Sequence, residues 1–539
     1  MSSPTTLPVD AEPHTIVIVA GAGLSGLDAL IQFKRVLGVT DVVVYEKSSD
    51  LGGTWASNKY PGASCDIPIA LYSFSFEPAK EFNTQWPGAD DSLTHFSSRT
   101  NPQFSTGICQ YYNRVVDKFG VRQQIVYRTV VEEARFSRST GLWTVRIRNV
   151  ETGETRTKTC NVFISAVGAL STPADAPFDA GRFEGRVMHS AEWDHGVDLK
   201  DKDVVVLGNG CSAAQIVPAV LPKVKSLTQI ARSPHSIVAP NAIIDNAFTN
   251  GIFRWVPGMF SFFRYAVFQI CESYFYLSST TDKAAKGRKE IKRQSDRYIE
   301  KVAPEKYWDK LKYDFEFGQK RRIIDFSGYA PSLHSPKFSL LLPDTIASAE
   351  GRTVKTEKGV EVPADVIVLS TGFKVTDYLF PLKVFNSEGE SLVERLKGNG
   401  VKTYLTSMVA SYPNFFILMG PNSVTGHSSA LFQTECTVEM LLSLVKPVIS
   451  AIRSNGEKLA DPAPSVEVTQ VAEDEWYGEM RKAMDGRIWE KDGGISWYVD
   501  PEQKKCTTLF PWGQPEFQRQ TRDIKKERFV WTSCDQGKK

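Results

Sequence analysis

The stretch Gly21-Ala22-Gly23-Leu24-Ser25-Gly26 follows a run of β-branched and apolar residues, 15–20, and precedes apolar residues at helical spacing as far as Leu37. A strand, a Gly-x-Gly-x-x-Gly turn and a helix in this order are typical of a dinucleotide-binding unit. The first glycine permits the tight turn, the second lets the backbone approach a pyrophosphate, and the third lets the helix pack against the strand. The sequence therefore predicts an α/β unit whose helix N-terminus receives phosphates.

A second strand supports this prediction. Residues 42–45 are again apolar and end in Glu46. A dinucleotide site has an acid about twenty residues after its glycines, where the carboxylate accepts hydrogen bonds from the ribose hydroxyls. These residues predict a dinucleotide without saying which one.

The same order of elements occurs a second time. Residues 203–207 predict a strand, Gly208-Asn209-Gly210-Cys211-Ser212-Ala213 forms the turn, and a helix is expected to about Val220. Ala213 takes the packing position of the third glycine, which costs little because alanine is nearly as small.

The strand expected next, residues 227–231, ends in Arg232-Ser233. An NAD site has an acid at this point, whereas an arginine can pair with the 2′-phosphate of NADP, and Ser233 can support it with its hydroxyl. The second unit therefore indicates NADPH. The alternative is a surface arginine that is only solvated.

Length and composition limit the class of protein. A chain of 539 residues is too long for one core, so two or three domains are expected. A hydrophobic content of 42% and a net charge of +2 predict a globular protein with no general affinity for nucleic acid. Its eight cysteines include no Cys-x-x-Cys pair, so we expect no metal site and a reducing, cytoplasmic location. Residues 1–13 predict a disordered lead-in without a signal peptide, and no apolar run predicts a membrane span.

The segment after the first unit favours a flavin. Gly53-Thr54-Trp55 offers close backbone approach and a flat aromatic face, although Trp55 is also compatible with a core position. Asp66 lies among small and apolar residues, where a carboxylate requires a cationic partner. Tyr72 fits a strand or a cofactor wall equally well.

The middle of the chain interrupts the strand–helix alternation. Residues 241–311 contain an aromatic-rich stretch, 248–277, followed by a charged helix expected over 283–301. The aromatic stretch has three interpretations: the core of a small helical subdomain, the wall of an apolar substrate cavity, or contact with a membrane surface. Elsewhere we expect a hairpin at 129–136 and 142–148, and one strand at 361–369.

A third motif, Phe183-Glu-Gly-Arg-Val-Met-His-Ser-Ala-Glu-Trp-Asp194, lies between the two units. It resembles the fingerprint of type I Baeyer–Villiger monooxygenases, in which it is an interdomain linker tied down by the histidine, here His189. Related N- and S-oxidising enzymes end the motif differently. Further segments resemble the same family, with fungal members closest in character: 168–173, 365–373, 414–422, 496–498 and the Lys320-Arg321 pair.

The resemblance covers nearly the whole chain and implies an α/β fold with two Rossmann-like domains, for FAD and NADP, and a helical insert. It implies these boundaries: FAD domain 14–170 and 376–539, NADP domain 171–238 and 318–375, insert 239–317. The oligomeric state does not follow from the sequence.

The resemblance also implies a reaction. NADPH would reduce FAD, O₂ would add to give an anionic C4a-peroxyflavin, and attack on a ketone would yield an ester or lactone. Arg321 would stabilise the peroxyflavin anion, Asp66 would position Arg321, and Lys320 would contact NADP. Arg322 is the second candidate for the catalytic arginine. An N- or S-oxidising enzyme and a non-oxygenating flavoprotein redox module remain the alternatives.

The expected cofactor-binding residues come from both glycine turns, the flavin-side loops, the basic pair and a late loop. They are Gly21, Gly23, Ser25, Gly26, Glu46, Gly53, Thr54, Trp55, Asp66, Tyr72, Gly208, Asn209, Gly210, Cys211, Ser212, Ala213, Arg232, Ser233, Lys320, Arg321 and Trp497.

Overall fold

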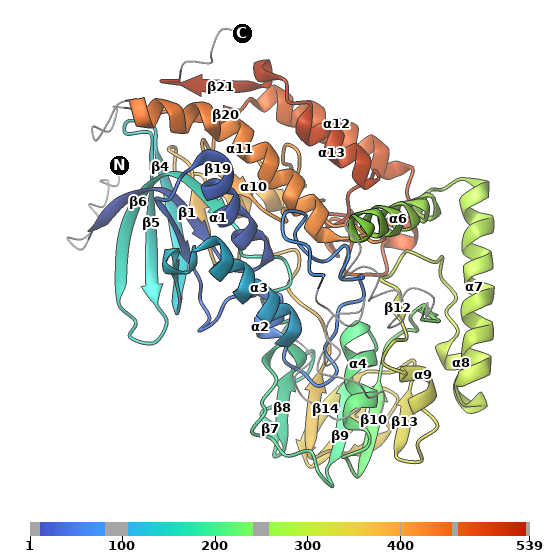
Figure 1. The fold of residues 1–539 in the computed structure, drawn as a ribbon. Helices are drawn as coiled ribbons and strands as arrows, with labels where there is room; N and C mark the ends of the chain where they lie inside the picture. Colours follow the sequence, from blue (N-terminus) through green and yellow to red (C-terminus); the bar gives the residue numbers. More distant parts are fainter. Residues whose placement is uncertain (1–10, 81–105, 241–257, 399, 455–461, 535–539) are drawn as a thin grey trace.

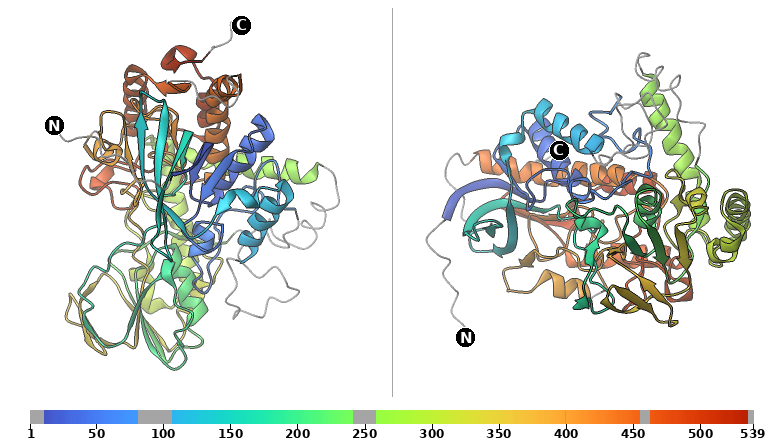
Figure 2. Two further views of the ribbon diagram at one scale, coloured as in Figure 1. Left: turned by 90° about the vertical axis from the view of Figure 1, so that its left-hand side faces the viewer. Right: turned by 90° about the horizontal axis from the view of Figure 1, so that it is seen from below.

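The computed structural model describes residues 11–80, 106–240, 258–398, 400–454 and 462–534. It has two lobes, each built on a largely parallel β-sheet, with a helical arm beside them (Figure 1). The left-hand view of Figure 2 shows the lobes at opposite ends of the molecule. The chain leaves the first sheet after β6, builds the second, and returns to the first with β18 and β19.

The first sheet surrounds the strand that carries the first glycine turn. Strand β1 lies between β2 and β6 and is parallel to both, while β4 and β5 form the expected antiparallel hairpin. The order is β18-β4-β5-β6-β1-β2-β3, with β19 also on β6. The strands are β1 (Ala11–Ala20), β2 (Val42–Tyr45), β3 (Ile125–Val126), β4 (Thr129–Ser137), β5 (Leu142–Asn149), β6 (Thr155–Ser165), β18 (Lys383–Phe385) and β19 (Phe415–Ile417).

Both faces of this sheet are buried. Apolar residues alternate along β1, so that Val17 and Val19 pack under the helices while Ile18 packs on the other face with Trp143 and Phe163. The helices on the first face are α1 (Leu24–Leu37), α3 (Thr106–Phe119), α11 (Ala430–Ser454), α12 (Gln470–Asp485) and α13 (Gln514–Arg522); α10 (Leu392–Gly398) covers the other.

The second sheet carries the second glycine turn and is entirely parallel, in the order β13-β10-β9-β17-β8. Its strands are β8 (Arg186–His189), β9 (Asp203–Leu207), β10 (Ser226–Ile230), β13 (Phe338–Leu341) and β17 (Val366–Leu369), and its helices are α4 (Cys211–Val220) and α9 (Tyr329–Ser332). A smaller sheet beside it contains β7 (Arg182–Phe183), β14 (Ile346–Gly351), β15 (Thr353–Thr356) and β16 (Glu361–Pro363).

The insert is helical where it is described. It contains α6 (Met259–Ser273), α7 (Asp282–Val302) and α8 (Trp308–Leu311), and α7 stands at the side of the molecule in Figure 1. The chain enters and leaves the insert through two short strands that pair in parallel, β11 (Ile237–Val238) and β12 (Ile323–Ile324). Residues 248–257 of the aromatic-rich stretch lie outside the described residues.

Two expectations are corrected. Residues 361–369 form two strands in different sheets, β16 and β17, and not one. Pro363 has no N–H for a continued ladder, and the Asp365 carboxylate accepts the backbone N–H of Asp203 at 3.0 Å, which fixes the crossing between sheets. The lead-in expected through residue 13 is shorter, because β1 already pairs with β6 at Ala11.

Asn414 joins three parts of the first lobe. Its backbone has φ +54°, and its buried side chain donates to the carbonyl oxygens of Asn161 (2.9 Å) and Pro464 (3.0 Å). Its Oδ1 accepts the N–H of Val466 at 2.9 Å. The side chain therefore ties β6 and β19 to β20 (Ser465–Val468), the partner of β21 (Phe529–Thr532).

Asn414→Ala removes these three buried hydrogen bonds and places alanine in a left-handed conformation. We expect a loss of about 2–4 kcal/mol in the free energy of unfolding, seen as a lower thermal midpoint by circular dichroism. The exposed Ser387→Ala is the control and should leave the midpoint unchanged. An unchanged midpoint in Asn414→Ala would show that the first lobe does not depend on this link.

Candidate active site

The first glycine turn leaves a backbone cradle. Gly21 has φ +105°, and a Cβ there would lie 2.6 Å from the carbonyl oxygen of Ala166. Gly53 has φ +55°, and its Cβ would lie 2.8 Å from Cα of Gly23. Gly23 is also the N-cap of α1, where no side chain caps the helix. Two bare backbones therefore face each other at the positive end of a helix, which fits a dinucleotide pyrophosphate.

Glu46 lies at the end of β2, where the sequence places it, and its carboxylate is buried. Oε2 accepts the backbone N–H of Ala22 at 2.7 Å. Oε1 accepts the N–H and the hydroxyl of Ser48, at 2.9 and 2.6 Å. The carboxylate thus also orders the glycine turn, a role that the spacing alone did not indicate.

The flavin-side residues form one aromatic group. Trp55, on the short helix α2 (Thr54–Ser57), donates its indole N–H to the Tyr72 hydroxyl at 3.1 Å, and the rings meet edge to face at 5.8 Å. Burial raises the pKa of Tyr72 above its ordinary value, so its hydroxyl stays protonated. Ser25 faces another way, with Oγ 3.4 Å from Thr434 Oγ1 on α11.

The second glycine turn has the same open form. A Cβ on Gly208, at φ +113°, would collide with the carbonyl oxygen of Ser370, whereas a Cβ on Gly210 would meet nothing within 4 Å. Gly210 is the N-cap of α4, again without a side-chain cap. Ala213 is fully buried behind it, as its packing position requires.

A basic group lies beside this turn. Lys320 Nζ donates to Ser233 Oγ at 2.6 Å and to the Pro234 carbonyl at 3.2 Å, and Asn209 donates to the Ser233 carbonyl at 2.8 Å. Burial and the charge of the exposed Arg232 lower the pKa of Lys320. Lys320 and Arg232 repel each other and lie near the N-terminus of α4, which has no side-chain cap. An anionic group such as a nucleotide phosphate would be stabilised there by both cations and by the helix dipole.

Arg321 and Asp66 form an ion pair across 255 residues of sequence. The guanidinium donates from NH2 to Oδ1 and Oδ2 of Asp66, each at 2.6 Å, and from Nε to Oδ2 at 3.1 Å. The side chains keep 20% and 23% of their exposure. The pair joins the loop after α2 in the first lobe to the basic segment beside the second glycine turn.

Arg322 takes a different position. Its NH1 donates to the carbonyl oxygen of Gly426 at 2.9 Å, and Arg321 NH1 lies 3.5 Å from the same oxygen. The Cys211 thiol, at the start of α4, lies 3.7 Å from the Arg322 carbonyl oxygen. The loop at Gly426 therefore contacts both arginines through one carbonyl oxygen, while the start of α4 contacts the Arg322 backbone.

The pKa values distinguish the two arginines. Burial alone would raise the pKa of Asp66 and lower that of Arg321, but their mutual attraction outweighs it, so the pKa of Asp66 is lowered and that of Arg321 is raised. The pKa of Arg322 is lowered by burial and by the charge of Arg321. Arg321 is thus the better stabilised cation.

The late loop contributes a residue that the sequence prediction did not select. Trp497 keeps 37% of its exposure, whereas its neighbour Tyr498 is buried, with the two rings 4.8 Å apart. Burial raises the pKa of Tyr498 to about 12 although both arginines oppose it. Adjacency in a loop could not predict this difference in burial between Trp497 and Tyr498.

His235 was not selected from the sequence as a site residue either. Its Nδ1 lies 3.4 Å from the Arg321 carbonyl oxygen, and burial together with the charge of Lys320 lowers its pKa to about 4. It is therefore neutral near pH 7. Its position two residues after Ser233 was the available signal.

The fingerprint lies away from these groups. His189 ends β8, its Nδ1 accepts the N–H of Ala191 at 3.1 Å, and its ring meets Phe373 edge to face at 5.8 Å. Trp193 packs against the core of the second lobe, and Asp194 pairs with Arg186 at 3.0 Å. The structure makes the fingerprint part of the second lobe, because it contains the end of β7 and all of β8, and β8 pairs with β17.

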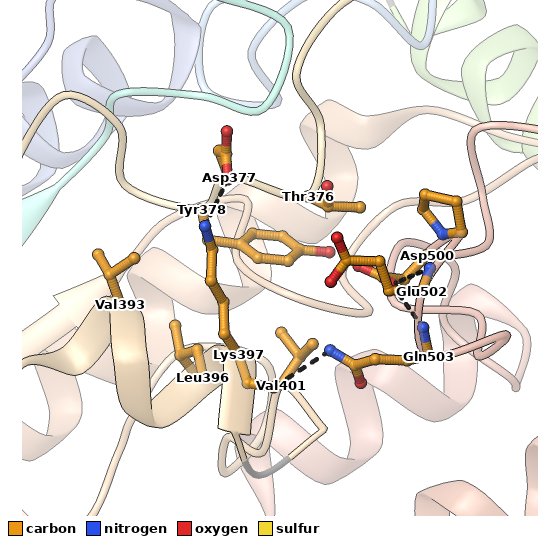
Figure 3. Close-up of a pocket in the computed structure, with 11 residues that line it drawn as sticks. Thr376, Asp377, Tyr378, Val393, Leu396, Lys397, Val401, Asp500, Glu502 and Gln503 are labelled. Atoms are coloured by element: carbon orange, nitrogen blue, oxygen red, sulfur yellow. Dashed lines mark hydrogen bonds and ion pairs between the residues drawn. The ribbon is translucent and has the colours of Figure 1, made fainter.

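Two cavities lie outside the predicted site residues. One, of about 150 Å³, lies between residues 376–378, 393–397, Val401 and residues 500–503, where Asp377 and Lys397 pair at 2.9 Å (Figure 3). The other, of about 390 Å³, lies between α6 and the start of α11 and α13, with Leu71, Phe268 and Phe432 in its wall. Among the described residues, no group of acidic, histidine or cysteine side chains suits a metal ion. None of the described helices has the length and apolarity to cross a membrane.

Known proteins match the chain over most of its length. A family model described as flavin-binding monooxygenase-like matches residues 14–238. A Baeyer–Villiger monooxygenase of Streptomyces coelicolor is 32% identical over 518 residues, 95% of this chain and 91% of that protein. The FAD-binding monooxygenase ktnD of the fungus Aspergillus niger is 30% identical over 460 residues, 84% of this chain and 72% of that protein.

Solved structures share the fold. Cyclohexanone monooxygenase from Rhodococcus sp. Phi1, bound to NADP⁺, is similar with a TM-score of 0.77 and 23% identity, over 97% of this chain and all of that one. The predicted α/β fold with two Rossmann-like units and a helical insert is confirmed. Together with the 32% identical relative, the matches show that this chain belongs to the Baeyer–Villiger monooxygenases among the flavin-binding monooxygenases.

Proposed function

We propose that the chain uses NADPH and O₂ to insert one oxygen atom beside the carbonyl of a ketone. Ketone, O₂, NADPH and a proton give an ester or lactone, NADP⁺ and water. The observation that carries this proposal is the Arg321–Asp66 pair, a permanently charged guanidinium held at three contacts of 2.6–3.1 Å, next to the Arg322 carbonyl oxygen that lies 3.7 Å from Cys211 of the second glycine turn.

The residues present fit the two cofactors. Gly21, Gly23 and Gly53 would hold the FAD pyrophosphate, Glu46 the ribose and Trp55 the ring region. The turn at residues 208–213, with Arg232, Ser233 and Lys320, would hold NADPH. When bound, NADPH supplies the hydride, and the flavin accepts it and activates O₂.

Arg321 suits oxygen insertion because it stays charged and does not release its proton at working pH. Negative charge develops on the ketone oxygen when a nucleophilic oxygen adds to the carbonyl carbon, and a fixed cation stabilises it. A group that donated its proton would instead favour electrophilic oxidation of amines or sulfides. Asp66 holds the guanidinium in place.

Lys320 and Arg232 would act on the nicotinamide cofactor. Lys320 is fixed by Ser233 and Pro234, so its ammonium is in place before the cofactor binds. Arg232 is exposed at the end of β10 and free to pair with a 2′-phosphate.

The expected domain boundaries are part of this proposal. Strands of the first sheet lie within residues 14–170 and 376–539 apart from the start of β1, and those of the second within 171–238 and 318–375, in support of the FAD and NADP assignments. All eight cysteines are free, which supports a reducing compartment such as the cytoplasm.

Product analysis tests the proposed function. The purified protein with FAD and NADPH would receive linear, cyclic and aryl ketones and one sulfide under ¹⁸O₂, and products would be identified by mass spectrometry. We expect an ester or lactone that carries one ¹⁸O. Sulfoxide as the only oxygenated product would contradict it in favour of S-oxidation, and turnover of NADPH without any oxygenated product would contradict it in favour of a redox module.

Arg321→Ala should keep flavin reduction by NADPH and lose ester formation by about 10²-fold or more, because one fixed charge-stabilising group is removed. Stopped-flow absorbance measures reduction, and gas chromatography measures ester. Arg321→Lys keeps a charge beside Asp66 and controls for loss of folding; it should also be slow, since an ammonium cannot reproduce the three contacts. Full ester formation in either variant would refute the assignment.

Arg232→Ala should raise KM for NADPH about 10- to 100-fold, the value of one charge-assisted contact, and change KM for NADH little. Steady-state kinetics with both cofactors measure this. Lys225→Ala, at the other end of β10, is the matched control. An equal loss with both cofactors would rule out a 2′-phosphate contact.

A further inference from the structure

One histidine–carboxylate pair connects the helical insert to the loop that holds the arginines. Glu272 lies near the end of α6, and its Oε1 is 2.7 Å from His427 Nε2. The two side chains keep only 11% and 13% of their exposure, so solvent screens the contact weakly. The pair joins segments 155 residues apart in the sequence.

The second oxygen of Glu272 has a partner as well. Oε2 accepts the backbone N–H of Gln514, the first residue of α13, at 3.0 Å. A carboxylate at this end of a helix is favoured by the helix dipole. Gln514 in turn donates its side-chain amide to the Ser429 carbonyl at 2.6 Å. Glu272 is thus fixed at both oxygens and holds loop residues 427 and 429 by two routes.

The histidine ring is held on its other sides. Nδ1 lies 2.8 Å from Thr425 Oγ1, and the ring packs on Phe275, with centroids 4.9 Å apart. The His427 backbone N–H also donates to Thr425 Oγ1, at 3.5 Å. The threonine hydroxyl can therefore donate to Nδ1 while the ring N–H at Nε2 donates to Glu272.

Between Thr425 and His427 lies Gly426, whose carbonyl oxygen accepts from both arginines, at 2.9 and 3.5 Å. Because side-chain contacts on either side hold this peptide, the position of the carbonyl depends on the Glu272–His427 pair. The carbonyl oxygen in turn helps to hold the guanidinium of Arg322 and, at the longer distance of 3.5 Å, that of Arg321, which Asp66 also holds.

We infer that Glu272 and His427 are positioning residues that couple the insert to the reactive arginine. The inference rests on the proposed function of Arg321. Helix α6 also forms one wall of the 390 Å³ cavity that reaches Ser429, so a ligand that displaces α6 changes the same contacts. In addition to any contact with substrate, the position of the insert determines whether Arg321 is correctly placed.

Ester formed per NADPH consumed is the first readout, since misplaced arginines should waste reduced cofactor as hydrogen peroxide. Glu272→Gln and His427→Phe should each lower this ratio about threefold or more, while the rate of flavin reduction and the FAD content stay at wild-type values. His427→Gln keeps an N–H donor toward Glu272 and should recover part of the ratio. The double variant should be no worse than the worse single one, because the two residues act as a unit.

The second readout does not depend on activity. Hydrogen exchange by mass spectrometry, on protein without NADPH or ketone, should show faster exchange in the peptide that covers residues 421–431 in Glu272→Gln and His427→Phe. Glu290→Gln, an exposed ion pair on α7 of the same insert, is the matched control and should change neither readout.

The outcomes separate this inference from the proposed function. Wild-type protein that makes no ester refutes the proposed function, and the exchange experiment still tests the loop contact. Wild-type exchange, or a wild-type ester ratio, in both Glu272→Gln and His427→Phe overturns the inference. The inference is also overturned if FAD content and the rate of flavin reduction in the variants fall in proportion to ester formation, because that pattern indicates only general destabilisation.

Discussion

The buried attraction between Asp66 and Arg321 is the interaction on which the site depends. A carboxylate in partly desolvated surroundings requires a cation, and a guanidinium satisfies both of its oxygens at once. Asp66 lies in the loop after α2 in the first lobe, and Arg321 lies where the chain leaves the insert, beside the second glycine turn. The ion pair therefore joins the two lobes.

Other contacts act through this pair. Gly426 supplies a carbonyl oxygen to both arginines, Tyr498 is buried against them, and Cys211 connects the Arg322 backbone to the start of α4. Arg322 is the less stabilised cation of the two, because its neighbour repels it and its main partner is a neutral carbonyl. The two adjacent arginines therefore differ in how strongly their surroundings stabilise the positive charge.

Local chemistry made much of the fold predictable. Both glycine turns belong to strand–turn–helix units, and a few glycines meet the steric requirements of each turn. In the structure, Gly21 and Gly208 have the positive φ that the turns require. The need of Asp66 for a cation was also predictable from its apolar neighbours. The split of residues 361–369 was not, because the choice between two sheets is made by Asp365 and its partner Asp203 across the fold.

The least predictable part was the connection through the insert. Nothing near Glu272 in sequence indicates His427, and the aromatic residues around it suggested only a core, a cavity wall or contact with a membrane surface. The contact exists because α6 packs against the starts of α11 and α13, a tertiary arrangement with no local signal. Tyr498 is a similar case, since only the packed loop distinguishes it from Trp497.

Asp66→Asn provides the most direct test of the central claim, because it removes the charge that holds Arg321 and keeps the size of the side chain. The measurement is ester formed per NADPH consumed, together with the rate of flavin reduction. We expect flavin reduction close to the wild-type rate and a ratio lower by about tenfold or more, because a charged hydrogen-bonded contact is lost. A wild-type ratio would contradict the claim that the Asp66–Arg321 pair organises the chemistry.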